Sequence, residues 1–501
     1  MGRGISEDKN KNKGNNGDKR TDNQAACKGK PGRRQKPEAP EPTTADLIKI
    51  TLDHFFPDFN DMVLELDDPR LPERITYSVK HLIYLGLCMY LFYCGSRNQL
   101  YSDRKSINFH RNLLRLSGTG EEFTASPCAM NYLMEEMDST DNLELIPGKM
   151  TAKLIRSRVF DKFRNLQGDF LVAVDAVHIH TEKGKHSNCV YKTVNGETDS
   201  YYYVLEAKLI TQNGMGFSIA SVFIENEEEY EKQDCELKAF YRLAKILEKR
   251  FPRLPMCLLF DGLYPNKNVL EICRKNKWGH YITLKSGCCP KLYNDAMVQI
   301  RKNPGNSLFH QTEDGAGQHI LWTDNLKYDG QRTYLLICKE TKFTPADGVQ
   351  TKTFVWITNI KPTKDNAVQM VKEGRCRWHI EEAFNIQKNG GYELEHNYGT
   401  VGYARKNYYY LLQIAHILHQ LMIRSDLFPN LQKKFILHEY SGLPKLIKAY
   451  IAVVAESTIK HFRTIKNFVK KLLESFRNHK ISEMTTNQNY IGKLRVRLDS
   501  S

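Results

Sequence analysis

Residues 170–181 read FLVAVDAVHIHT, and this stretch decides the fold class. A long apolar run rich in β-branched residues, bounded by glycines, predicts a buried β-strand. SYYYVLEAKLIT (200–211) and GFSIASVFIE (216–225) predict two more strands, and Asn213-Gly214 is a turn signal between them. Because the links between these strands are short, we expect the three to pair in antiparallel fashion.

Beyond residue 225 the pattern alternates between helix and strand. A charged helical segment is followed by MCLLFD (256–261), which predicts a short buried strand. Residues 266–277 predict a helix, and HYITLK (280–285) predicts another strand. The order of three strands, helix, strand, helix, strand predicts an α/β protein. Its mixed sheet would carry flanking helices, as in ribonuclease-H-like folds.

Changes of pattern divide the chain into six regions. Alternating segments such as TYLLICKE (333–340), separated by Asp-Gly turns, predict an all-β insertion within the core, and helical periodicity returns at Asp365. The expected regions are a disordered basic arm (1–42), an N-terminal helical domain (43–165), the first part of the ribonuclease-H-like core (166–289), the β-rich insertion (290–364), the second part of the core (365–430) and a basic C-terminal helical region (431–501).

The charge balance points to a polyanionic partner. The chain carries a formal charge of +15, and residues 431–501 hold 14 Lys and Arg against 5 Asp and Glu. A soluble protein this basic favours nucleic acid as its partner.

The longest apolar run, Leu82 to Cys94, is too short to span a bilayer, so we expect no membrane segment. Twelve cysteines without a CxxC pair indicate reduced thiols.

Three carboxylates stand out as candidates for catalysis. Asp175 interrupts a buried strand, where an unpaired carboxylate is costly. Asp261 ends a buried strand, which is where α/β sheets place functional groups, although an Asp before Gly262 also suits a plain turn. Glu381 lies in RCRWHIEEAFNIQK (375–388), a segment with helical periodicity.

The segment around Glu381 places basic residues beside the acid. Arg377 is four residues before Glu381 and Lys388 is seven after it, so all three share one broad helical face. Glu382 is a rival acid, but it is rotated about 100° away from this alignment. An ordinary amphipathic helix with solvated charges is the simpler alternative.

Three carboxylates form a hard-oxygen site that suits Mg²⁺ or Mn²⁺. Two such ions can activate a water or a 3′-hydroxyl and stabilise the leaving oxygen in phosphoryl transfer. Arg377 and Lys388 would bind phosphate on the same face. We therefore predict a two-metal site acting on nucleic acid.

The order of the two aspartates and RWxIExxFxxxK, with a β-rich insertion before the glutamate, resembles the insertion-sequence-type cut-and-paste DDE transposases. Their signature is Tyr-x2-Arg-x3-Glu-x6-Lys, and Gly374 stands here at the Tyr position. The resemblance implies that Asp175, Asp261 and Glu381 bind the metals, while Arg377 and Lys388 hold the backbone of the element's ends.

The same resemblance implies double-stranded DNA partners, both transposon ends and target, bound by a homodimer in a synaptic complex. It also implies a cytoplasmic, nucleoid-associated protein of a prokaryote. Some relatives stack an aromatic residue of the insertion on a flipped base, and Trp356, Phe354 and Trp322 are the candidates for this DNA contact. Core packing is the alternative for each aromatic residue.

Two other functions stay open at this point. One is a catalytically inactive, domesticated DNA-binding protein, and the other is a stand-alone metal-dependent nuclease.

His178 and His180 form an HxH pair, but no further nitrogen or sulfur ligands are evident for zinc. The acidic run from Glu225 to Glu236 is typical of a solvated helix start.

Overall fold

The computed structural model describes residues 45–140, 142–226, 232–285, 287–345, 348–424 and 458–480. The predicted basic arm and most of the predicted C-terminal region lie outside these ranges. Within them, no helix is long and apolar enough to cross a membrane. The eleven cysteines in these ranges are all free.

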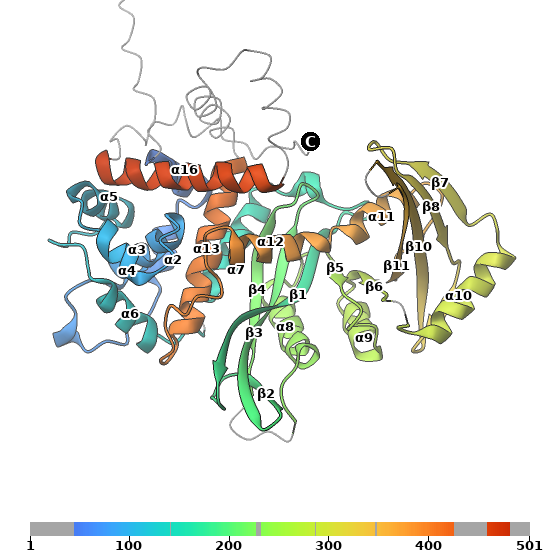
Figure 1. Ribbon diagram of the computed structural model, residues 1–501, viewed down its shortest axis with the longest axis horizontal. Coiled ribbons are helices and arrows are strands. Elements are labelled where there is room, and N and C mark those ends of the chain that lie inside the picture. Colours follow the sequence, from blue (N-terminus) through green and yellow to red (C-terminus); the bar gives the residue numbers. More distant parts are fainter. Residues whose placement is uncertain are drawn as a thin grey trace, which may run out of the picture. The chain divides into compact units, whose positions relative to one another are not determined.

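The strands of the described residues form one mixed sheet (Figure 1). Its order is β2-β3-β1-β5-β6-β11-β10-β8-β7, with β4 paired to β3 and β9 paired to β10. The strands are β1 (Phe170–Lys183), β2 (Val190–Val194), β3 (Glu197–Ile210), β4 (Gly216–Ile224), β5 (Met256–Phe260), β6 (Gly279–Thr283), β7 (Ser307–Gln311), β8 (Gly317–Trp322), β9 (Leu326–Tyr328), β10 (Gln331–Thr344) and β11 (Gly348–Thr358).

The first half of the sheet agrees with the predicted mixed α/β arrangement. Strands β1, β3 and β4 pair in antiparallel fashion, while β5 runs parallel to β1 and β6 runs parallel to β5. Strand β2 was not predicted. It forms a hairpin with β3 through Asn195-Gly196, both at positive φ, which is a common two-residue hairpin turn.

The prediction of an all-β insertion is wrong at its start. Residues Pro290–Lys302 form the helix α10, with proline at its first position and Leu292, Ala296 and Ile300 buried at four-residue spacing. The insertion strands also extend the core sheet, since β11 pairs with β6 in antiparallel fashion. The period of two begins only at β7, so the sequence boundary at 290 was placed one helix too early.

Helices cover the sheet and build the N-terminal region (Figure 1). Helix α12 packs on β1, β3 and β4, and the long, mostly buried α13 contacts α1, α3, α6 and α7. The helices are α1 (Asp46–Phe55), α2 (Phe59–Leu64), η1 (Pro72–Arg74), α3 (Val79–Leu91), α4 (Arg97–Asp103), α5 (Ile107–Ser117), α6 (Pro127–Glu136), α7 (Leu145–Arg156), η2 (Asp161–Phe163), α8 (Glu236–Arg250), α9 (Lys267–Lys275), α10, α11 (Ala367–Arg375), α12 (Trp378–Asn389), α13 (Ala404–Arg424) and α16 (Thr458–Asn478).

A buried polar chain ties α12 to the sheet and to α13. Lys208 of β3 is fully buried, and its ammonium donates to Gln413 Oε1 at 2.7 Å and to Glu206 Oε1 at 3.4 Å. Gln387 of α12 donates to the same Gln413 oxygen at 2.9 Å. Because removing one partner would leave a buried polar group unsatisfied, this chain fixes the position of α12.

The C-terminal helix α16 packs on the N-terminal helical region. Its apolar residues Val469, Leu472 and Phe476 are buried, while Lys466 and Lys470 are exposed. The Asn112 amide of α5 donates to the carbonyl of Phe476 at 2.8 Å. The predicted amphipathic character of this helix is therefore present in the part of it that the structure describes.

Gly374 in α11 lies against the buried indole ring of Trp356 in β11. A Cβ atom at Gly374 would stand 2.7 Å from Trp356 Cε2 and 2.8 Å from its Nε1. Trp356 is 2% exposed, so its ring has little room to move. The close approach of helix and strand thus explains why glycine, and not tyrosine, occupies this position.

We expect Gly374→Ala to lower the free energy of unfolding by about 1–2 kcal/mol, although alanine is the better helix former. The added methyl must displace a packed ring. Urea unfolding followed by tryptophan fluorescence measures the change. Gly305→Ala is the matched control, because a Cβ there meets nothing within 4 Å, and it should change stability by less than about 0.5 kcal/mol. A Gly374→Ala protein as stable as the parent would contradict the packing argument.

Candidate active site

Asp175 and Asp261 lie level on neighbouring parallel strands. The β1–β5 register pairs Ala173 with Leu259, and continuing it by two residues places Asp175 beside Asp261, which follows the end of β5. Adjacent strands are about 4.8 Å apart. The two carboxylates also interact electrostatically. The strand and strand-end positions identified in the sequence therefore meet on two neighbouring inner strands of the sheet.

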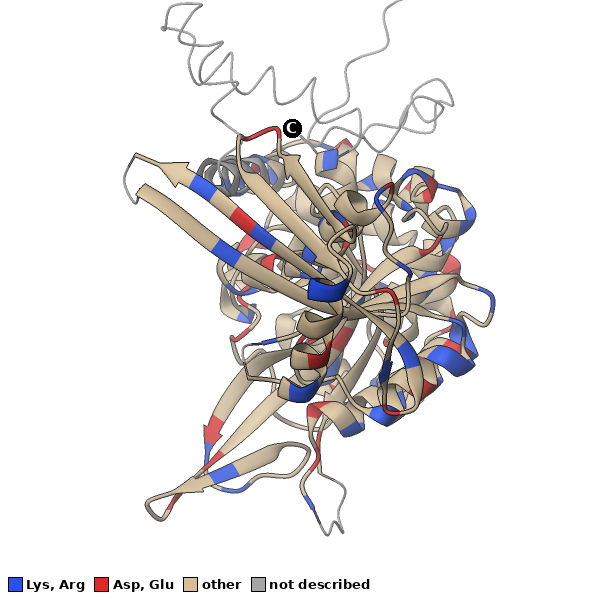
Figure 2. Ribbon diagram, turned by 90° about the vertical axis from the view of Figure 1, so that its right-hand side faces the viewer, with Lys and Arg blue, Asp and Glu red and all other residues tan. Residues whose placement is uncertain are grey.

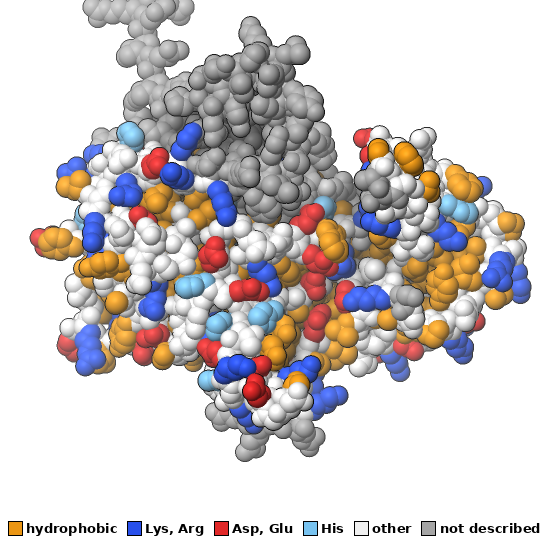
Figure 3. All heavy atoms as spheres, viewed as in Figure 1, with side chains coloured by type: hydrophobic (Ala, Val, Ile, Leu, Met, Phe, Trp, Pro, Cys, Tyr) orange, Lys and Arg blue, Asp and Glu red, His pale blue; other side chains and the backbone are white. Residues whose placement is uncertain are grey.

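Arg377 joins Glu381 to this pair. Its guanidinium contacts Glu381 Oε1 at 2.5 Å and Asp175 Oδ2 at 3.4 Å. Arg377 is the N-cap residue of α12 and Glu381 lies in the first turn, so the four-residue spacing places both on the side facing β1. Figure 3 shows acidic side chains gathered where α12 crosses the sheet.

Lys285, just after β6, is a second cation of the site. Its ammonium lies 2.9 Å from Asp261 Oδ2, and the other oxygen of Asp261 accepts from the Leu263 amide at 2.8 Å. Bonding to Asp261 raises the pKa of Lys285, so the ammonium stays charged. Nothing in the sequence singles out Lys285, because a lone lysine after a strand carries no motif.

The electrostatics of Asp175 reflect its crowded position. Burial raises the pKa of its carboxyl to about 7, the charge of Arg377 opposes this rise, and the neighbouring carboxylates of Glu236, Glu381 and Asp261 add to it. A carboxyl in this state is half protonated near neutral pH. Any cation that joined the cluster would favour its ionised form.

Glu236, the first residue of α8, also belongs to this cluster. It was expected to be a solvated residue of an acidic run, yet it is only partly exposed and accepts a hydrogen bond from the Tyr264 hydroxyl at 2.7 Å. Burial raises its pKa, and the charge of Asp261 contributes to that rise. The sequence offered no signal for this placement beyond a helix start that follows β4.

The rival acid Glu382 points elsewhere. Its carboxylate pairs with His379 Nδ1 at 2.7 Å, and half of its side-chain surface is exposed. Lys388, the last basic residue of the motif, pairs with Glu395 Oε1 at 2.7 Å, and His178 lies 3.5 Å from the same oxygen. Both motif cations are therefore engaged by carboxylates of this chain.

The aromatic candidates for base stacking are differently placed. Trp356 and Trp322 are buried, at 2% and 3% exposure, and neither presents a free ring face for a base. Phe354 is partly exposed beneath the guanidinium of Arg375, 4.9 Å from its ring centre. Both tryptophans therefore pack in the core, which was the alternative for them. Figure 2 faces the side of the molecule that carries the β10–β11 hairpin, with Lys and Arg positions in blue.

The donor chemistry of the cluster fits a divalent cation, because carboxylate oxygens are the preferred ligands of Mg²⁺ and Mn²⁺. Yet in the part of the chain that the structure describes, no three His, Cys, Asp or Glu side chains are placed to contact one ion. The Arg377 guanidinium lies between Asp175 and Glu381 instead. A bound cation would have to replace the positive charge that Arg377 places between Asp175 and Glu381.

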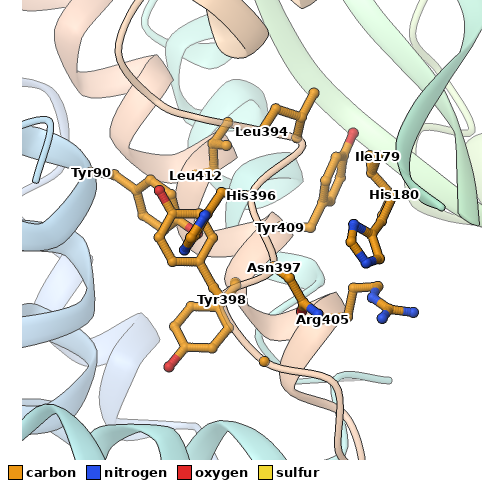
Figure 4. Close-up of a pocket in the computed structure, with 12 residues that line it drawn as sticks. Tyr90, Ile179, His180, Leu394, His396, Asn397, Tyr398, Arg405, Tyr409 and Leu412 are labelled. Carbon is orange, nitrogen blue, oxygen red and sulfur yellow. The ribbon is translucent and has the colours of Figure 1, made fainter. Parts of the chain in front are cut away.

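A small pocket lies further along β1, away from the carboxylates. Figure 4 shows His180 and Arg405 at one end of it and Tyr90 and Tyr398 at the other. The pocket is enclosed by α3, β1, α13 and the segment after α12, and His396 also lines it. His180 of the HxH pair therefore lines this pocket, whereas Asp175 does not.

No model of a known protein family matches the sequence, and no curated protein matches it. A solved structure of the piggyBac transposase synaptic complex with hairpin DNA aligns with 89% of this chain and 84% of that chain. The identity is 10% and the TM-score is 0.37. A likeness this weak carries no argument, so the functional conclusion depends on the residues of the site.

The raised pKa of Asp175 predicts a pH-dependent cost to stability. The group binds a proton more tightly in the folded chain than in the unfolded chain. Its contribution to stability is therefore full below about pH 4 and is lost as the pH rises through about 7. Asp175→Asn should stabilise the protein by roughly 2–4 kcal/mol at pH 8 and by close to nothing at pH 4.

The measurement is urea unfolding across this pH range in buffer containing a chelator. Asp161→Asn is the matched control, because Asp161 is a surface aspartate that pairs with Arg164, and its effect should not follow the same pH profile. If Asp175→Asn destabilises the protein equally at both ends of the range, the carboxylate crowding described here is wrong.

Proposed function

We propose that this protein is a DNA transposase that binds the terminal inverted repeats of its element and catalyses metal-dependent strand cleavage and strand transfer. The observation that carries the proposal is the contact of Arg377 with both Asp175 and Glu381. It joins residues about 200 positions apart in the chain into the motif that the sequence contains.

The topology supports the same proposal. The spatial order β4-β3-β1-β5-β6, with β5 and β6 parallel to β1, is the order of ribonuclease-H-like cores. In this arrangement Asp175 belongs to the central strand and Asp261 follows its parallel neighbour. Asp261, at the carboxyl end of β5, lies where α/β sheets bind ligands, and the strand register places Asp175 beside it.

Each side chain then has a defined role. Asp175, Asp261 and Glu381 would hold Mg²⁺ or Mn²⁺, and two such ions would supply activation of a water or 3′-hydroxyl and stabilise the leaving oxygen. Arg377 and Lys388 exchange their present carboxylate partners for backbone phosphates of the element's end. Lys285 stays paired with Asp261. Joining two ends requires two copies of this chain.

Glu381→Gln should abolish strand cleavage while leaving DNA binding nearly unchanged. The substitution preserves the shape of the side chain and removes the charge that a divalent cation needs. A labelled duplex containing the element's end, with Mg²⁺ or Mn²⁺, allows binding and nicking to be scored separately. A loss of about a thousandfold or more in the cleavage rate is expected.

The adjacent Glu382→Gln is the matched control, because its carboxylate pairs with His379 outside the cluster, and it should cleave within about threefold of the parent rate. Nicking by the Glu381→Gln protein at the parental rate would refute the assignment. If the parent protein binds the duplex but never cuts it, the inactive DNA-binding function replaces the transposase.

Lys388 should become more available to DNA when its partner is removed. Glu395→Gln deletes the carboxylate that holds the Lys388 ammonium, so duplex affinity at low salt should rise about threefold to tenfold. Lys388→Ala should weaken binding and reduce the log–log salt slope by about 0.9. Fluorescence anisotropy at several salt concentrations measures both effects.

Glu393→Gln is the control for this pair, because Glu393 is an exposed acid of the same segment after α12. It removes an equal charge from the surface without freeing Lys388. Equal gains in affinity from Glu395→Gln and Glu393→Gln would mean that net charge alone is responsible and that the pair with Lys388 is irrelevant.

A further inference from the structure

The C-terminal helix α16 is attached to α5 by side chains that cap its last turn. The Asn112 amide of α5 donates to the carbonyls of Phe476 and His479, at 2.8 Å and 2.7 Å. Ser106, the N-cap residue of α5, donates to the carbonyl of Arg477. Because the last carbonyls of a helix have no partner within it, these bonds satisfy them and fix the end of α16.

Aromatic packing decides which side of α16 faces inward. The centre of the Phe476 ring lies 4.9 Å from that of Phe92 and 5.1 Å from that of Phe109. Val469 and Leu472 are buried on the same side of the helix, since residues three and four apart share a helical face. The opposite side of α16 therefore faces outward.

This outward side carries lysines at four-residue spacing. Lys466 and Lys470 are exposed, and neither pairs with a carboxylate of the chain that the structure describes. Arg111 and Arg115 have the same spacing on the neighbouring α5, and Arg111 is exposed. Like charges at this spacing repel each other and destabilise a helix. Two helices in contact thus each carry a repulsive pair of cations.

The acids of this region do not balance its cations. Residues 97–115 hold five Lys and Arg against one Asp, and residues 466–480 hold five against one Glu. The aspartate, Asp103, is buried and pairs with Arg477 at 3.3 Å. Its charge is therefore neutralised inside the protein. Figure 3 shows Lys and Arg side chains gathered along α16 and over α5.

The connection between α4 and α5 adds further groups that can contact phosphate. Tyr101 is 48% exposed, with the Arg104 guanidinium 4.7 Å and the Lys105 ammonium 5.1 Å from its ring centre. The end of α4 adjoins α16 through the pair of Asp103 with Arg477. Lysine, arginine and tyrosine side chains are among those that commonly contact DNA phosphates.

We propose that the outer sides of α4, α5 and α16 bind the phosphate backbone of duplex DNA. This basic helical surface consists of Tyr101, Lys105, Arg111, Lys466 and Lys470. A row of phosphates relieves the repulsion between its cations and releases the counterions of the DNA. The inference rests on the proposed function for the identity of the polyanion, and it deepens that function by naming where the duplex docks.

An anionic membrane is a poorer partner for this surface. A helix that lies on a membrane inserts its apolar side among the lipids. The apolar side of α16 is already buried, with Phe476 packed against Phe92 and Phe109. What α16 presents to a partner is its charged side, which suits a polyanion that needs no inserted apolar residues.

The test is fluorescence anisotropy of the full-length protein with a labelled duplex of mixed sequence, about 30 base pairs long, at several salt concentrations. Combining Lys466→Ala with Lys470→Ala should reduce the log–log salt slope by about 1.8 and weaken binding at low salt by about tenfold or more. Combining Lys466→Arg with Lys470→Arg keeps both charges and should bind within about twofold of the parent.

The matched control combines Lys245→Ala with Lys249→Ala. These two lysines are exposed at the same spacing on α8, so the same charge is removed from a different helix. The control should weaken binding by less than about threefold. Thermal unfolding verifies that each variant is folded. Equal losses from the α8 and α16 variants would mean that net charge alone is responsible, and would refute the basic helical surface.

The remaining outcomes separate this surface from the proposed function. If the parent cuts its element's ends but the Lys466→Ala, Lys470→Ala protein binds duplex as the parent does, the surface is refuted and the function stands. If the parent binds duplex through these lysines but never cuts, the surface stands and the catalytic proposal fails. Tighter binding to phosphatidylserine vesicles than to duplex, lost in the same variant, would make a membrane the partner and overturn the inference.

Discussion

Carboxylates brought together on neighbouring strands repel one another, and the cations beside them allow this part of the sheet to form. Asp175 and Asp261 are forced together by the parallel β1–β5 register, and α12 adds Glu381. Arg377 bridges Asp175 and Glu381, while Lys285 neutralises Asp261. The placement of the first turn of α12 against β1 therefore depends on one guanidinium that is shared between two acids.

The rest of the core supports this contact from a distance. The buried chain Lys208–Gln413–Gln387 fixes the second half of α12 against β3 and α13. The absence of a side chain at Gly374 lets α11 approach the Trp356 ring and sets the direction from which the chain enters α12. A carboxylate cluster that is electrostatically costly is thus held by apolar and polar contacts outside it.

Much of this arrangement was predictable because local patterns carried it. The buried runs around Asp175 and before Asp261 identified the strands, and helical spacing placed Arg377 beside Glu381. Periodicity did not predict the features that depend on tertiary packing. It did not reveal that α10 precedes the insertion strands, it did not distinguish the buried Trp356 and Trp322 from the partly exposed Phe354, and it did not predict the bond of Glu236 with Tyr264. Nothing in the sequence singles out Lys285, whose partner Asp261 is 24 residues away, or Glu395, which follows the helix in a segment without periodicity.

The central claim is that divalent cations replace the Arg377 guanidinium between the acids of the cluster. The most direct measurement is anomalous diffraction from crystals of the protein with a duplex and Mn²⁺, recorded where manganese scatters anomalously. We expect a manganese peak beside the Asp175 carboxylate, with Arg377 turned away from Asp175 toward a backbone phosphate. A map without a manganese peak at Asp175, in which Arg377 still joins Asp175 to Glu381, would contradict the claim.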